Sequence, residues 1–87
     1  MFYVKVIDTR GRRPYGSIKV DIWRNGLING GKIVTDYADN DGIVAVNAEI
    51  PFNGTIYVNG KKAFAGMIER TSIAIEKLND YQYHRIM

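Results

Sequence analysis

The segment TIYVNGKKAFA, residues 55–65, decides the fold class of this chain. Two runs of strand-forming residues flank a single Asn-Gly pair, Asn59 and Gly60. Such a pair between two such runs is the strongest short-range indication of a β-hairpin, because both central residues of the tightest turn adopt a positive φ. The segment therefore predicts two neighbouring antiparallel strands.

Similar runs of strand length recur on both sides of this hairpin. Clusters of Gly, Pro, Asn and Asp separate them, and these residue types are typical of turns. One such turn is marked by the pairs Asn25-Gly26 and Asn29-Gly30. The further strand-like runs span residues 2–8, 17–23, 32–37, 42–48 and 69–78.

The composition agrees with a chain built from strands. Twelve Ile and seven Val stand against only two Leu, and β-branched residues favour strands over helices. A helix competes only in the last run, where Glu69, Ile73 and Lys77 also fit helical spacing, and the β-branched content favours a strand there. With 87 residues, 46% of them apolar, the chain has the material for one small packed core. We expect an all-β, antiparallel Greek-key β-sandwich, Ig-like in type, of about seven short strands over residues 1–78, followed by a C-terminal tail over 79–87.

The spacing of the turn residues adds a resemblance to a known family. The matching positions are Val4, Val6, Asp8, Gly11, Pro14, Gly16, Val20, Thr35, Asp36, Asp41, Gly42, Pro51, Gly54 and Tyr57. This pattern, over roughly residues 4–58, resembles the carboxypeptidase regulatory-like domains, which have the prealbumin-like (transthyretin-like) fold. The chain departs from it where Arg12 and Arg13 precede Pro14 and Tyr15 precedes Gly16. The resemblance implies a β-sandwich that serves as a binding, folding or spacing module and not as a catalyst.

Alternation within the strands predicts which aromatic side chains point outward. If the apolar residues at even positions of the first two strands face the core, Tyr3 and Trp23 point away from it. The same reasoning places Tyr57 outward, between inward Ile56 and Val58. Three outward aromatic rings can stack sugar rings or pack against a second subunit.

The sequence offers little for catalysis. The only histidine is His84, and neither Ser17 nor Ser72 lies in a G-x-S-x-G context. The absence of Cys excludes a thiol nucleophile, a disulfide framework and every thiolate metal site. We expect a protein that is not an enzyme and needs no cofactor.

One acidic segment, TDYADNDG over residues 35–42, is a weak candidate for a metal site. Its carboxylates Asp36, Asp39 and Asp41 are the hard ligands that calcium and magnesium prefer. The EF-hand pattern fails, however, because Tyr37 stands where an acidic residue would be needed. An Asx-rich turn explains the segment better than a metal site does.

Basic residues gather in the loops at one predicted end of the domain. If successive strands run antiparallel, the loop over residues 9–16, the turn over 38–42 and the Asn59-Gly60 turn share that end. The residues collected there that we expect to bind a ligand are Arg10, Arg12, Arg13, Tyr15, Lys61 and Lys62. The net charge of +3 agrees with an acidic partner surface or a polyanion as the ligand. The alternative is ordinary solubilising charge, because Asp39 and Asp41 lie at the same predicted end and neutralise part of its field.

The sequence thus favours a non-enzymatic binding or assembly module that acts through its sheet surface, an edge strand or its loop end. The alternatives are a carbohydrate-binding module that uses Tyr3, Trp23 or Tyr57, and a small-barrel binder of nucleic acid or another polyanion. The expected partners are a protein and a second copy of the chain, because a sandwich leaves strand edges open. No membrane span or signal peptide is visible. The sequence leaves the location undetermined, and the cytoplasm is the default expectation only if the sequence is full-length.

Overall fold

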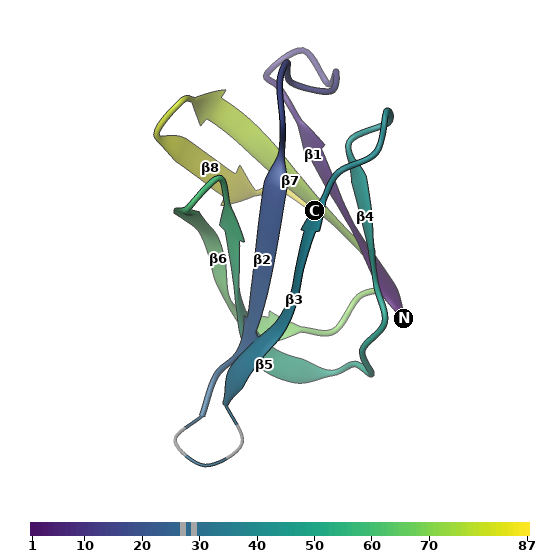
Figure 1. Cartoon of the computed structure of the whole chain (residues 1–87), viewed down its shortest axis with the longest axis vertical. Coiled ribbons are helices and arrows are strands. Elements are labelled where there is room, and N and C mark those ends of the chain that lie inside the picture. Colours follow the sequence, from purple (N-terminus) through teal and green to yellow (C-terminus); the bar gives the residue numbers. More distant parts are fainter. Residues whose placement is uncertain (27, 29) are drawn as a thin grey trace.

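The computed structural model describes residues 1–26, 28 and 30–87, and this part of the chain is all-β (Figure 1). The strands are β1 (Phe2–Ile7), β2 (Lys19–Arg24), β3 (Gly31–Tyr37), β4 (Ile43–Val46), β5 (Phe52–Val58), β6 (Lys61–Ile68), β7 (Ser72–Asn79) and β8 (Gln82–Arg85). None of the described residues lies in a helix long and apolar enough to cross a membrane. The turn expected at Asn29-Gly30 lies partly outside the described residues, because Asn29 is not among them.

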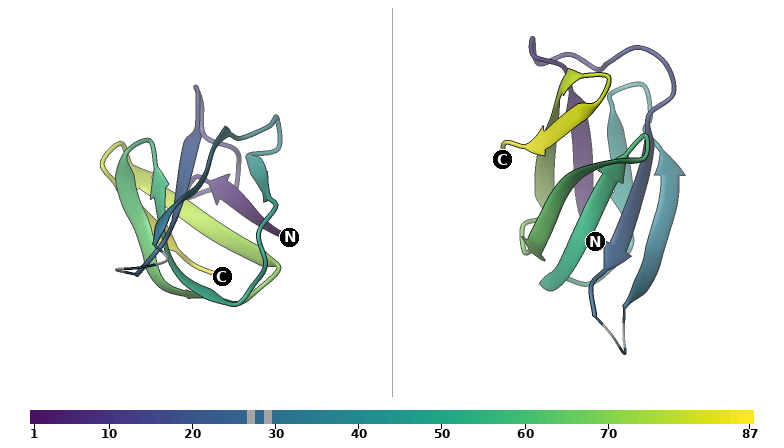
Figure 2. Two further views of the ribbon diagram at one scale, coloured as in Figure 1. Left: turned by 60° about the horizontal axis from the view of Figure 1, so that its bottom comes forward. Right: turned by 90° about the vertical axis from the view of Figure 1, so that its left-hand side faces the viewer.

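The strands form two four-stranded sheets, ordered β4-β1-β7-β8 and β3-β2-β5-β6. Figure 2 shows the sheets as two layers that face each other. All neighbouring strands are antiparallel except β1 and β7, which are parallel and pair Tyr3 with Ser72 and Ile7 with Glu76. The expectation of a purely antiparallel arrangement is therefore wrong at this one pair. Strand direction alternates along the chain, so β1 and β7 run the same way. Because the sheet order places them side by side, they pair in parallel.

The buried side chains of both sheets form a single cluster. On β1 and β2 the predicted inward residues are buried, whereas Tyr3 and Trp23 are partly exposed, as the alternation predicts. The core residues from the first two strands and the segment before β2 are Phe2, Val4, Val6, Ile18, Val20 and Ile22, each no more than 2% exposed. The hydrophobic effect of burying these β-branched and aromatic side chains holds the two layers together.

The central hairpin has the predicted turn. Asn59 and Gly60 have φ values of 50° and 79°, and β5 and β6 pair directly on either side of them. Both strands are longer than the sequence indicates, because β5 already begins at Phe52 and β6 continues to Ile68. The segment that also fitted a helix is strand β7.

The strand count differs from the expected seven. The segment 79–87, which the sequence analysis treats as a tail, contains the eighth strand, β8. β8 pairs antiparallel with β7, and Tyr83 contributes to the core with 7% of its surface exposed. The Asn59 Nδ2 amide donates a hydrogen bond to the Tyr83 hydroxyl at 3.3 Å. The segment is ordered by partners distant in sequence, which its own residues do not reveal.

Candidate functional site

Four loops meet at one end of the molecule, in the upper part of Figure 1. We call this surface the loop end; it comprises residues 8–18, 38–42, 59–60 and 80–81. The first three loops are joined at the start of β2, where the Ala38 N–H donates to the Ile18 carbonyl at 2.9 Å and the Asn59 N–H to the Lys19 carbonyl at 2.8 Å. Alternating strand direction thus brings together the three segments that the sequence analysis places at one end.

Asp8 shapes the loop that carries the arginines. Its Oδ1 atom accepts the N–H groups of Arg10 at 2.8 Å and Arg12 at 2.9 Å. Its own N–H donates to the Arg12 carbonyl at 2.6 Å. The hydrogen bond from the Arg12 N–H is the main reason why the pKa of Asp8 lies below its usual value. The carboxylate thus closes the loop on itself and leaves the exposed side chains of Arg10 and Arg12 at the surface.

Arg13 differs from its two neighbours because its guanidinium is used within the structure. Its Nε donates to the Asp39 carbonyl at 2.8 Å, which ties the arginine loop to the β3–β4 turn. A terminal guanidinium nitrogen donates to the carbonyls of Pro14 at 2.7 Å and Gly16 at 3.1 Å. We therefore assign Arg13 to holding the loop end together rather than to contact with a ligand.

Asp39 organises the β3–β4 turn in the same way as Asp8 organises the arginine loop. Its Oδ1 accepts the N–H groups of Asp41 at 2.8 Å and Ile43 at 2.9 Å. The bond from Ile43 is the main cause of a lowered pKa for Asp39. Asp36 accepts the N–H of Tyr37 at 2.7 Å. The described residues contain no group of three acidic, His or Cys side chains placed to hold a metal ion.

Exposed cations lie in the arginine loop and just beyond the Asn59-Gly60 turn, at the start of β6. Arg10, Arg12, Lys61 and Lys62 are all exposed. The three ion pairs of the described chain involve other residues, namely Lys32–Asp21, Lys77–Asp80 and His84–Glu76. These four cations therefore have no carboxylate partner within the described structure, which leaves them available to an external anion.

Exposed aromatic side chains stand among these cations. Tyr15 is fully exposed, and Tyr81 is 77% exposed with the Lys61 ammonium 5.6 Å from its ring centroid. Tyr81 and the neighbouring Leu78 are absent from the sequence-predicted site. The parallel pairing of Ile7 with Glu76 carries the chain after β1 past the end of β7, and this brings Leu78 beside the arginine loop.

Two hollows flank Tyr15. The first has a volume of about 340 Å³ and is lined by Asp8, Thr9, Arg10, Arg12, Arg13 and Tyr15; we call it the arginine hollow. The second has a volume of about 270 Å³ and is lined by Asp8, Thr9, Pro14, Tyr15, Lys77, Leu78 and Asn79; we call it the Leu78 hollow. Asp8, Thr9 and Tyr15 line both hollows.

The structure does not assemble the three-ring aromatic platform. Tyr3 lies on β1 in one sheet, whereas Trp23 and Tyr57 lie on β2 and β5 in the other. Trp23 and Tyr57 do line a common hollow of about 440 Å³. The Lys32 ammonium stands 5.4 Å from the Trp23 ring centroid and takes up part of the surface that a sugar would need.

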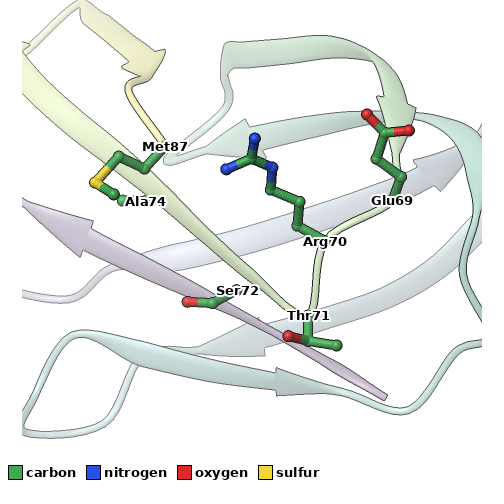
Figure 3. Close-up of a pocket in the computed structure, with 6 residues that line it drawn as sticks. All are labelled: Glu69, Arg70, Thr71, Ser72, Ala74 and Met87. Carbon is green, nitrogen blue, oxygen red and sulfur yellow. The ribbon is translucent and has the colours of Figure 1, made fainter.

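The remaining groups with possible catalytic chemistry do not converge. His84 Nε2 lies 3.0 Å from Glu76 Oε1 on the outer face of β7 and β8. Ser72 lies four residues before Glu76 on the same strand, roughly 13 Å away at the usual strand rise. A hollow of about 590 Å³ near the β6–β7 loop contains Ser72 with Glu69 and Arg70 but no histidine (Figure 3). Among the described residues, no hydrogen bond joins the Ser72 hydroxyl to the Glu69 carboxylate, so the hollow shows no paired nucleophile and base.

No model of a known protein family matches this sequence, and no curated protein matches it either.

Proposed function

We propose that this protein is a non-enzymatic binding module that recognises an acidic partner through its loop end. The observation that carries this proposal is a set of exposed cations, Arg10 and Arg12 on the arginine loop and Lys61 and Lys62 at the start of β6, with exposed Tyr15 and Tyr81 on the same end of the molecule. Asp8, Asp39 and Arg13 hold the arginine loop and the β3–β4 turn in place. Binding residues are typically presented on loops that a rigid scaffold positions. Arginine is well suited to a carboxylate partner because its planar fork donates two parallel hydrogen bonds.

We also propose that the two sheets form a Greek-key sandwich of the prealbumin-like type. Support comes from the connections, which cross between the sheets after β1, β3, β4 and β6, and from β1 lying between β4 and β7. This agrees with the resemblance to carboxypeptidase regulatory-like domains. Such domains are generally binding or spacing modules, in line with the function proposed for the loop end.

Removing the two exposed arginines tests the function. We expect the double variant Arg10→Ala, Arg12→Ala to bind immobilised poly-L-glutamate and heparin at least about tenfold more weakly than the parent, because two charge-assisted contacts are lost. Measurements at two salt concentrations give the ionic contribution. The variant should melt close to the parent, since these residues hold the loop only through their backbone N–H and carbonyl groups.

The matched control is Lys5→Ala, Arg70→Ala. Both of its residues are exposed, on β1 and in the β6–β7 loop, and the net charge falls by the same two units. An equal loss of binding in both variants would mean that overall charge, and not the loop end, determines retention.

A carbohydrate-binding function is a second candidate, supported by the hollow that Trp23 and Tyr57 share. A sugar that stacks on Trp23 should change its fluorescence, and the variant Lys32→Ala should strengthen the effect by uncovering the ring. Trp23 is the only tryptophan, so its emission reports on this site alone. Unchanged emission across a panel of neutral oligosaccharides would rule the candidate out.

A further inference from the structure

The two hollows beside Tyr15 differ in chemistry although they share a wall. The arginine hollow is lined by three guanidinium-bearing residues, and the one carboxylate in it, that of Asp8, already accepts two backbone N–H groups. The cations of Arg10 and Arg12 therefore remain available to a carboxylate from outside. A ligand group bound there would be anionic and small.

The Leu78 hollow offers apolar surface. Leu78 is 45% exposed near the end of β7, and the fully exposed Tyr15 and the buried Pro14 line the same hollow. Its cation, Lys77, is already paired with Asp80 at 3.1 Å. Apolar side chains left in water are stabilised when a partner covers them. An aliphatic side chain suits this hollow better than a second anion does.

We propose that the partner is a peptide segment in which a carboxylate side chain lies next to an aliphatic one. The carboxylate binds Arg10 and Arg12, the aliphatic group covers Leu78, and Tyr15 contacts both. This inference rests on the proposed function of the loop end and adds the chemical class of the partner. It explains why an exposed tyrosine stands between an arginine-lined and a leucine-lined hollow.

The charges around the loop end favour such a peptide over a nucleic acid. Exposed carboxylates lie in the adjoining loops: Asp41 is in the β3–β4 turn, which Arg13 joins to the arginine loop, and Asp80, with 82% of its side chain exposed, is beside Lys77 of the Leu78 hollow. A continuous phosphate backbone would have to pass these like charges. A peptide places its negative charge in one spot and leaves the flanking positions neutral.

Fluorescence anisotropy with short labelled peptides tests the inference. The probes are GSEELLSG, its apolar-deleted companion GSEEAASG and its charge-deleted companion GSQQLLSG. We expect GSEELLSG to bind about tenfold more tightly than GSEEAASG, the effect of covering part of one aliphatic side chain. The variant Leu78→Ser should reduce the affinity for GSEELLSG to that for GSEEAASG and leave the latter unchanged.

The control variant is Met67→Ser, which removes a similarly exposed apolar side chain from β6 and should change neither affinity; Met67 is 48% exposed. Equal binding of GSEELLSG and GSEEAASG would overturn the inference and leave the proposed function standing. Binding of poly-L-glutamate without binding of GSEELLSG would do the same. Equal binding of GSQQLLSG and GSEELLSG would overturn both. Tighter binding of oligothymidylate than of GSEELLSG would replace the peptide with a nucleic acid.

Discussion

Two aspartates give the loop end its shape. Asp8 and Asp39 each accept two backbone N–H groups through one carboxylate oxygen, so each closes a loop without another side chain. Arg13 then joins the two loops through the Asp39 carbonyl. Arginines that look equivalent in the sequence thus have different roles. Arg13 holds the structure, whereas Arg10 and Arg12 face solvent.

These aspartates make stability depend on pH. The pKa of each is lowered in the folded state, so their stabilising effect is fully present above the unfolded-state pKa of about 4 and is lost as pH falls through the lower, folded value. We expect the melting temperature of the parent to fall as the pH drops below about 4. The double variant Asp8→Asn, Asp39→Asn keeps the accepting oxygens but should show a smaller fall. A parent and variant with the same pH profile would contradict this account.

Gly42 is required at the β3–β4 turn for two separate reasons. Its φ is +78°, and a Cβ there would lie 2.6 Å from the Val6 carbonyl oxygen. Gly60 has nearly the same φ, +79°, with open space around it. We expect Gly60→Ala to destabilise the fold by about 1 kcal/mol and Gly42→Ala by about 3 kcal/mol, since overlap adds to backbone strain. Equal losses in urea unfolding would show that the close approach to β1 is unimportant.

Among the elements, strands with clear local patterns could be predicted, and those that depend on distant partners could not. Alternation over β1 and β2 predicts the core face, and the Asn59-Gly60 pair predicts the β5–β6 hairpin. β8 is missed because its order comes from pairing with β7 and from the Tyr83–Asn59 contact, across 24 residues. The candidate site is incomplete for the same reason. The parallel pairing of β1 with β7 has no local signal, so Leu78 and Tyr81 are missed.

β8 should matter for stability because Tyr83 lies in the core. We expect Tyr83→Ala to lower the free energy of unfolding by about 3–5 kcal/mol, the usual cost of removing a buried aromatic side chain. The neighbouring Tyr81 is exposed, so Tyr81→Ala should change it by only about 0.5 kcal/mol or less. Chemical denaturation of both variants measures the difference. Similar values would mean that residues 82–85 behave as a loose tail.

At the scale of the whole molecule, the two sheets contact each other closely along the edge strands β6 and β8 and much less along the edge strands β3 and β4. β6 and β8 meet where the Arg85 guanidinium lies 4.7 Å from the Phe64 ring centroid. On the other side, the edge strand β4 carries no charge and no proline, two devices that usually protect an edge from pairing. We expect weak self-association through this edge at high concentration in sedimentation experiments. The exposed-edge variant Ala45→Lys should reduce it, and Ala65→Lys on β6 should not; a strictly monomeric parent would contradict the prediction.

The central claim is that the loop end is the binding surface. The most direct measurement is an NMR titration of the ¹⁵N-labelled protein with the peptide GSEELLSG. The account predicts that the amide shifts that change belong to the loop end and to the adjoining end of β7, around Tyr15 and Leu78. Changes centred on Trp23 and Tyr57, on the outer face of the β3-β2-β5-β6 sheet, would contradict the account, and so would the absence of any change.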